Sequence, residues 1–214
     1  MMARIERALP AWAPPWVGRA VLATVAVVAI VVVSVTVGLG VAANGPAVEA
    51  APEDTYASAP GCDTVPTDTV ESAVPEARLD ASERGPLPAG DGSTCVWTSV
   101  DSADEAPRVL HVDFTASFTD DAEDVSGAAL ATERVEQLSS TENGDGGSVP
   151  SLGESALVRK ATPDGATAEV AFVRDNLAVR VLYGGDADSG GSQLTFDDAR
   201  EGAVSVAERL AEDL

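Results

Sequence analysis

The longest run of hydrophobic positions covers residues 20–43, where two threonines and a serine are the only polar side chains. At about 1.5 Å of rise per residue, a helix of this length reaches roughly 36 Å, enough to cross the hydrocarbon core of a bilayer. Three arginines precede the run, and no basic residue follows it until Arg78. The positive-inside rule therefore predicts a single-pass protein of the cell membrane, with residues 1–19 in the cytoplasm and the later residues outside.

A cleaved signal peptide is the alternative to a retained anchor, because small residues near 41–43 and 48–50 are compatible with cleavage. A signal peptide usually has an apolar region of only about 7–15 residues, however, which favours the anchor. Both interpretations export the rest of the chain. Residues 44–61, rich in Ala, Pro, Glu and Ser, are predicted to form a flexible stalk, and residues 62–214 one extracytoplasmic domain.

Beyond the stalk, the spacing of apolar positions changes several times. Alternation with a period of two predicts a half-buried strand over 108–118, and stripes spaced three and four residues apart predict helices over 121–138 and 195–213. The shorter segments are assigned as a helix (67–74), a loop (80–93) and strands (from 95 to 98, 156–160, 168–173 and 177–183). Thr195 and Asp198 are expected to form a capping box. Arg174-Asp175-Asn176 is predicted to be a three-residue hairpin turn, in which Asn176 tolerates a left-handed conformation.

Adjacent strands with short connections favour antiparallel pairing, and a helix with a single apolar stripe covers one face of a sheet. The predicted fold class is therefore α+β: an antiparallel sheet of about five strands with helices on one face, preceded by one transmembrane helix. The other face of the sheet, or a cleft beside it, is the expected place for a ligand.

The charge of the chain changes after the apolar run. The formal net charge is −22 overall, but it is +2 up to Asn44 and −24 beyond. A domain this acidic repels phosphate backbones, so nucleic acid is not an expected partner. Solubility accounts for the acidity more simply than a ligand does.

Cys62 and Cys95 are the only cysteines, and both follow the apolar run. In an oxidising compartment they are expected to form one disulfide, which stabilises the fold by on the order of 3–4 kcal/mol. A metal site would need further Cys or His ligands close by, and His111 is the only histidine. We therefore interpret the cysteine pair as structural.

The sequence shows no catalytic constellation, because His111 has neither a Gly-x-Ser-x-Gly elbow nor a free cysteine to work with. A calcium candidate begins at Asp186 and includes Asp188 and Asp197, but Gly190 lacks the ligand needed at the fifth place. We interpret this run as a Gly-rich loop between a strand and a helix. No catalytic residue, resident metal or cofactor is predicted.

Five short motifs lie between residues 61 and 214. They are Gly61-Cys62, Cys95-Val96-Trp97, Leu152-Gly153-Glu154-Ser155-Ala156, Asn176-Leu177 and Ala207-Glu208-Arg209-Leu210. Together with the N-terminal anchor, this set resembles actinobacterial cell-envelope domains of unknown function, a group similar to envelope lipoproteins and to the extracytoplasmic sensor domains of some mycobacterial receptor kinases. The chain differs from those relatives in having no lipoprotein cysteine and no kinase domain before the apolar run. The resemblance implies an envelope domain and names no ligand.

Two functions are compatible with the sequence. The favoured one is a non-catalytic binding, sensing or accessory domain of the cell envelope, anchored in the membrane through residues 20–43. Its partner would be an envelope protein, a glycan or a small molecule. The alternative is an acid-dependent cell-envelope hydrolase that uses paired carboxylates from the exposed sheet face.

Overall fold

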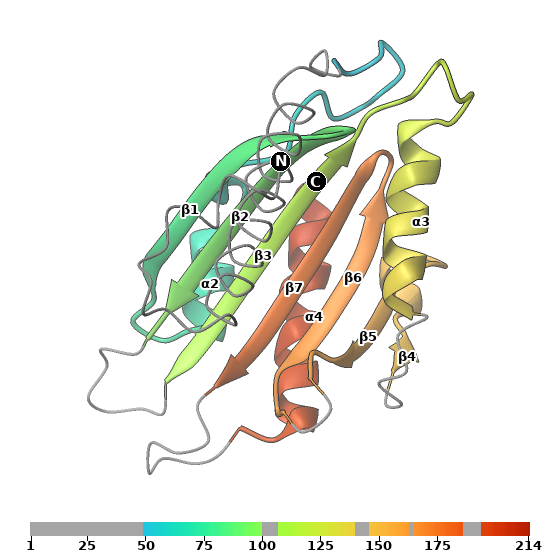
Figure 1. Ribbon diagram of the computed structural model, residues 1–214. Coiled ribbons are helices and arrows are strands. Elements are labelled where there is room, and N and C mark those ends of the chain that lie inside the picture. The colour runs from blue at the N-terminus through green and yellow to red at the C-terminus, as the bar shows by residue number, and fades with distance from the viewer. Residues whose placement is uncertain (1–48, 100–106, 140–145, 163–164, 186–193) are drawn as a thin grey trace, which may run out of the picture. The chain divides into compact units, whose positions relative to one another are not determined.

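The computed structural model describes residues 49–99, 107–139, 146–162, 165–185 and 194–214. Within these ranges the chain builds one antiparallel sheet with helices packed on it (Figure 1). The strands are β1 (Arg78–Leu87), β2 (Gly90–Thr98), β3 (Arg108–Ser117), β4 (Gly147–Ser148), β5 (Leu157–Lys160), β6 (Ala168–Arg174) and β7 (Leu177–Gly185). The helices are α2 (Thr67–Ala73), α3 (Gly127–Ser139) and α4 (Phe196–Asp213), with short 3-10 helices η3 (Cys62–Thr64) and η4 (Pro150–Leu152). The α+β class predicted from the sequence is confirmed.

The strand order in the sheet is β1-β2-β3-β7-β6-β5-β4, with seven strands where the sequence predicted about five. The largest difference is the predicted loop over 80–93, which is instead the β1–β2 hairpin. Gly85 and Pro86 suggested a loop, but β1 is an edge strand. A proline has no backbone N–H, and an edge strand tolerates it because the side that faces solvent needs no hydrogen-bond donor for the sheet. The two-residue β4 is the other strand that the pattern missed.

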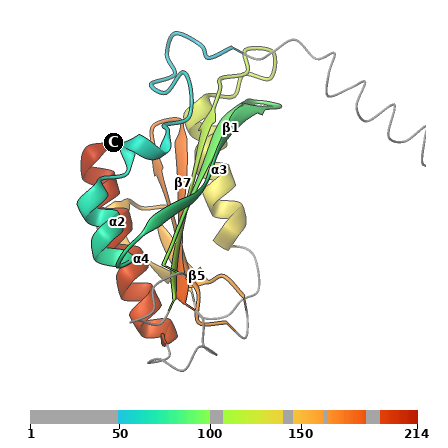
Figure 2. The ribbon, with the colours of Figure 1, turned by 90° about the vertical axis from the view of Figure 1, so that its left-hand side faces the viewer.

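Helices cover both faces of the sheet, so the prediction that they share one face is wrong. Figure 2 shows the sheet nearly edge-on, with α2 and α4 on one side and α3 on the other. The reason lies in β6 and β7, which are apolar on both faces. Phe172 and Val179 belong to the main core beneath α4, whereas the neighbouring Ala171 and Ala178 pack against α3. A strand that is apolar on both faces needs cover on both.

The main core lies between the sheet and α4. In β3 its members are the alternate residues Leu110, Val112, Phe114 and Ala116, all essentially inaccessible to solvent. The period-two prediction for this strand is thus confirmed. Thr195 and Asp198 form the predicted capping box at the start of α4.

Helix α3 begins later than the sequence suggested. The acidic residues from 120 to 124 form a turn closed by reciprocal backbone hydrogen bonds between Asp120 and Val125. Ser126 then caps the helix, because its hydroxyl accepts a hydrogen bond from the Ala129 amide at 3.2 Å. Gly127 lies so close to the Ser117 carbonyl that a side chain there would collide with it.

The β6–β7 turn also differs from its prediction. Its left-handed residue is Asp175, with φ of 49°, and β7 begins at Leu177 directly after Asn176. Asn176 is buried, and its amide group donates to the carbonyls of Tyr56 and Ser117 at 2.9 and 2.8 Å. The side chain of Asn176 therefore ties the N-terminal segment to the end of β3.

The segment assigned to the stalk is part of the folded domain from about residue 50 onward. Ala59 is 1% exposed, and its amide donates to Asp91 at 2.9 Å. The Asp54 carboxylate accepts hydrogen bonds from the amide and hydroxyl of Thr119. Hydrogen bonds to distant partners and the packing of a few residues, such as Tyr56 and Ala59, on the main core fix this segment. Its composition suggested a flexible stalk because large apolar residues are few.

The disulfide between Cys62 and Cys95 is confirmed, with a Cα–Cα distance of 5.6 Å. It joins η3 to β2 on the side of the main core, where Cys95 and Trp97 are buried. Among the described residues, no helix is both long and apolar enough to cross a membrane. The predicted anchor, residues 20–43, lies outside the described residues.

Candidate functional site

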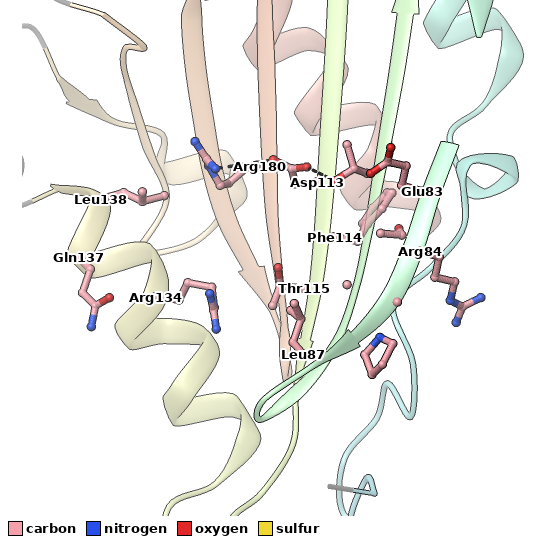
Figure 3. Close-up of a pocket in the computed structure, with 15 residues that line it drawn as sticks. Glu83, Arg84, Leu87, Asp113, Phe114, Thr115, Arg134, Gln137, Leu138 and Arg180 are labelled. Carbon is pink, nitrogen blue, oxygen red and sulfur yellow. Dashed lines mark hydrogen bonds and ion pairs between the residues drawn. The ribbon is translucent and has the colours of Figure 1, made fainter. Parts of the chain in front are cut away.

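An open groove of about 600 Å³ lies on the sheet face that α3 covers only in part (Figure 3). Its floor includes Gly85, Gly92 and Thr115, which are paired side by side across β1, β2 and β3. A Cβ atom added to Gly85 would meet no other atom within 4 Å. Two adjacent strands therefore lack side chains at the same level, and this gap helps to form the hollow.

Helix α3 forms one wall of the groove. Ala131 and Val135 pack on Ala171 and Ala178 of β6 and β7, and these small residues let the helix lie close to the sheet. The groove is lined from this helix by Arg134, Gln137 and Leu138. The other wall is the end of β1, where Leu87 is 39% exposed and leans over Gly92.

A row of polar side chains crosses the sheet at one end of this floor. Asp113 on β3 accepts a hydrogen bond from the Thr94 hydroxyl at 2.7 Å, and its Oδ1 lies 2.9 Å from His111 Nε2. The Arg180 guanidinium on β7 faces the other carboxylate oxygen of Asp113 at 3.6 Å. Asp113 thus has partners on its own strand and on both neighbouring strands.

The row continues to a buried carboxylate, Glu169 on β6, which is 1% exposed. Glu169 accepts hydrogen bonds from Arg180 Nε at 2.7 Å and from Arg159 Nε at 2.8 Å. Arg159 also donates to the Leu138 carbonyl in the last turn of α3, at 2.8 Å. A buried carboxylate requires such partners, and here they also bind the end of α3 to the sheet.

The partners of Asp113 hold it in the ionised form. Burial alone would raise the pKa of Asp113, but the hydrogen bonds from His111 and Thr94, with the charges of His111 and Arg180, outweigh burial and leave the pKa below its ordinary value. Asp113 is therefore a fixed negative charge that its neighbours largely neutralise.

Two charged side chains that line the groove take no part in this network of hydrogen bonds and ion pairs. Arg134 on α3 and Glu83 on β1 are exposed, and neither has a hydrogen bond or ion pair with another described residue. Figure 3 shows them on either side of the strands that carry Asp113 and Thr115. Arg84 lines the groove too, but its side chain pairs with Asp91 at 3.2 Å.

A second cleft, of about 370 Å³, lies between α2 and α4 on the opposite face. Several of its polar groups serve the fold: the Tyr183 hydroxyl donates to the Ala73 carbonyl at 2.7 Å, and Asp198 belongs to the capping box. Burial raises the pKa of Tyr183, so its hydroxyl stays protonated as that donor. The groove beside α3 is the better candidate, because Glu83 and Arg134 remain uncommitted there.

The site residues considered from the sequence lie in different parts of the chain, and only one of those that the structure describes lies beside the groove. His111 lies beside the groove and contacts Asp113, although no role for it was predicted. Asp186 and Asp188 of the calcium candidate lie outside the described residues, and Asp197 is exposed in the first turn of α4. No group of three possible metal ligands occurs in the part of the chain that the structure describes.

Sequence reasoning missed the main members of the site: Glu83, Arg134, Glu169 and Arg180. A usable signal existed for two of them, since Glu169 and Arg180 are charges with apolar neighbours on both sides within β6 and β7. Such a charge must have a partner when its strand is buried. Glu83 and Arg134 gave no such signal, because exposed charges are ordinary on a surface.

No protein-family model, curated protein or solved structure matches this chain. The groove must therefore be interpreted from its own residues.

Proposed function

We propose that this protein is a membrane-anchored, extracytoplasmic and non-catalytic binding domain of the cell envelope, and that its ligand binds in the groove beside α3. The observation that carries the proposal is the hollow over Gly85 and Gly92, flanked by the uncommitted charges of Glu83 and Arg134. Its volume of about 600 Å³ falls in the range of small-molecule sites. The fixed network of Asp113 and Glu169 supports a preformed site, which reduces the cost of ordering on binding.

The hydrolase alternative would need a proton donor and a base or nucleophile in the groove. Glu83 and Asp113 are the carboxylates that line it among the described residues. Because the pKa of Asp113 is lowered, its carboxyl group carries no proton to donate near neutral pH. Its remaining role would be as a base or nucleophile, but both of its oxygens already face donors. These features favour binding over hydrolysis.

The proposal can be tested by filling the hollow. Gly85→Leu adds a side chain where there is free space, and the backbone of Gly85 is not in the left-handed region. The control is Gly147→Leu in β4, outside the groove, where an added Cβ makes only ordinary contacts. Both variants should fold as the wild type does.

The measurement is amide NMR on the full chain in lipid nanodiscs. Three soluble probes are titrated separately: the dipeptide Ala-Leu, the disaccharide maltose and dihexanoylphosphatidylglycerol. We expect at least one probe to shift the amide signals of Gly92 and Thr115 saturably in the wild type and in Gly147→Leu, but not in Gly85→Leu. The proposal is overturned if no probe does so, or if Gly85→Leu binds as the wild type does. Release of a cleaved product that depends on Glu83 and Asp113 would instead support the hydrolase.

A further inference from the structure

The side of the groove formed by α3 offers an unoccupied guanidinium. A guanidinium carries five N–H donors in a planar fork that matches a carboxylate in a bidentate fashion. Arg134 spends none of these donors on another described residue. Arg134 directly precedes Val135, which is buried against the sheet. The backbone of Arg134 is therefore held beside the groove. Arg134 is thus a candidate partner for a carboxylate.

Arg180 also lines this side of the groove. Its Nε and Nη2 both contact Glu169 Oε1, at 2.7 and 2.6 Å, and its Nη1 faces Asp113 at 3.6 Å. The Arg180 side chain is still 37% exposed, and it lines the groove. The charge of Arg180 is therefore shared by two carboxylates, which leaves Arg134 as the uncommitted guanidinium among the described residues that line the groove.

The opposite wall carries the opposite charge. Glu83 on β1 pairs across the strands with Thr94, and Thr94 in turn pairs with Asp113. Because Glu83 has no partner among the described residues, its carboxylate is available to an ammonium group. A ligand with only negative charge would face Glu83 unfavourably, whereas a ligand with only positive charge would face Arg134.

Apolar side chains complete the lining. Leu87 leans over the floor from β1, and Leu138 lies in the last turn of α3. Both line the groove that Glu83 and Arg134 flank. A ligand that satisfies all of these groups has a carboxylate, an ammonium and an apolar substituent.

We propose that the groove binds a small zwitterion of the short-peptide class, with its carboxylate on Arg134 and its ammonium on Glu83. This inference rests on the proposed function, because it names the ligand class of the same groove. It adds a direction for the ligand, from the α3 wall to the β1 wall. The two ends are recognised separately, so each can be tested separately.

The experiment uses isothermal titration calorimetry on the full chain in nanodiscs, with Ala-Leu, N-acetyl-Ala-Leu and Ala-Leu-amide as probes. For the wild type, we expect removal of either end charge to weaken binding about tenfold. Arg134→Gln should weaken Ala-Leu to a similar extent but leave the affinity for Ala-Leu-amide nearly unchanged. Glu83→Gln should also weaken the binding of Ala-Leu about tenfold, but it should leave the affinity for N-acetyl-Ala-Leu nearly unchanged. This pattern of lost sensitivity separates direct contact from general damage to the fold.

Arg200→Gln on α4 and Glu136→Gln on the exposed side of α3 are the matched controls, since neither residue lines the groove. Both should bind all three peptides as the wild type does. The inference is overturned if Ala-Leu does not bind, if the capped peptides bind as well as the free one, or if the controls weaken binding equally. It then fails alone if maltose or the phospholipid still shifts Gly92 and Thr115 in the wild type but not in Gly85→Leu. The proposed function fails with it if no probe gives that result.

Discussion

The two faces of the sheet are built from the same strands but have different roles. On one face, alternate residues of β3 such as Val112 and Phe114 join a core closed by α4. On the other, the intervening Asp113 and Thr115 are half-buried, and they line a groove beside α3. The covering helices differ in length accordingly, since α4 has 18 residues and α3 has 13. The main hydrophobic core lies on the first face, whereas exposed and half-buried polar side chains line the groove on the second.

The comparison predicts that neighbouring residues in β3 will differ sharply in their effect on stability. Phe114→Ala leaves a cavity in the main core and should lower the free energy of unfolding by about 3–5 kcal/mol. Thr115→Ala, on the groove face, should change it by less than about 0.5 kcal/mol. Chemical denaturation of the two variants measures the contrast. Equal losses would show that the groove face contributes as much packing as the core.

The exception on the second face is Glu169, where a charge is buried among apolar residues. Glu169→Ala leaves Arg159 and Arg180 without their shared carboxylate, and we expect a loss of about 3 kcal/mol in the free energy of unfolding. Glu136→Ala on the exposed side of α3 serves as the control and should have little effect. If Glu169→Ala unfolds at the same denaturant concentration as the control, the network does not secure this face.

The smallest expected effect concerns the pH dependence of stability. The pKa of Asp113 is lower in the folded state than in the unfolded state, where it is about 3.9. Its stabilising contribution is therefore fully present above that unfolded-state value and is lost as the pH falls through the folded-state pKa. Stability curves of the wild type and Asp113→Asn should converge in acid. Asp121→Asn, a change at an exposed carboxylate, should keep the pH dependence of the wild type.

Much of the fold could be predicted because the polarity of the two faces alternates along β3 and because α4 carries a clear apolar stripe. The β1–β2 hairpin could not, since Gly85, Pro86, Gly90 and Gly92 suggest a loop when read singly. An edge strand accepts them, but only the pairing with β2 reveals that β1 is at the edge. Likewise, the position of α3 on the second face could not be predicted. The helix packs on alanines of β6 and β7, and these side chains are too small to mark a strand as apolar on both faces.

The candidate site was harder to predict than the fold. Glu169 and Arg180 could be flagged as charges inside buried strands, but their partnership depends on the register between β6 and β7. Glu83 and Arg134 become a pair of opposing charges only when α3 and β1 flank the same floor. The cysteine pair, in contrast, needed no register, because only two cysteines were available to bond.

The hydrogen bonds of Tyr56 have a mechanical consequence. Its amide and carbonyl bind the Asn176 side chain at 2.8 and 2.9 Å, and its hydroxyl donates to the Leu214 carbonyl at 2.7 Å. These hydrogen bonds form a clasp between the N-terminal segment, the β6–β7 turn and the end of α4. Tension applied to the chain before residue 49 would act on this clasp before the tension reached Cys62. If the clasp opened, the covalent bond to Cys95 would stop further peeling at β2. A pull from the N-terminal side would therefore be resisted first by the hydrogen bonds of Tyr56 and then by the disulfide.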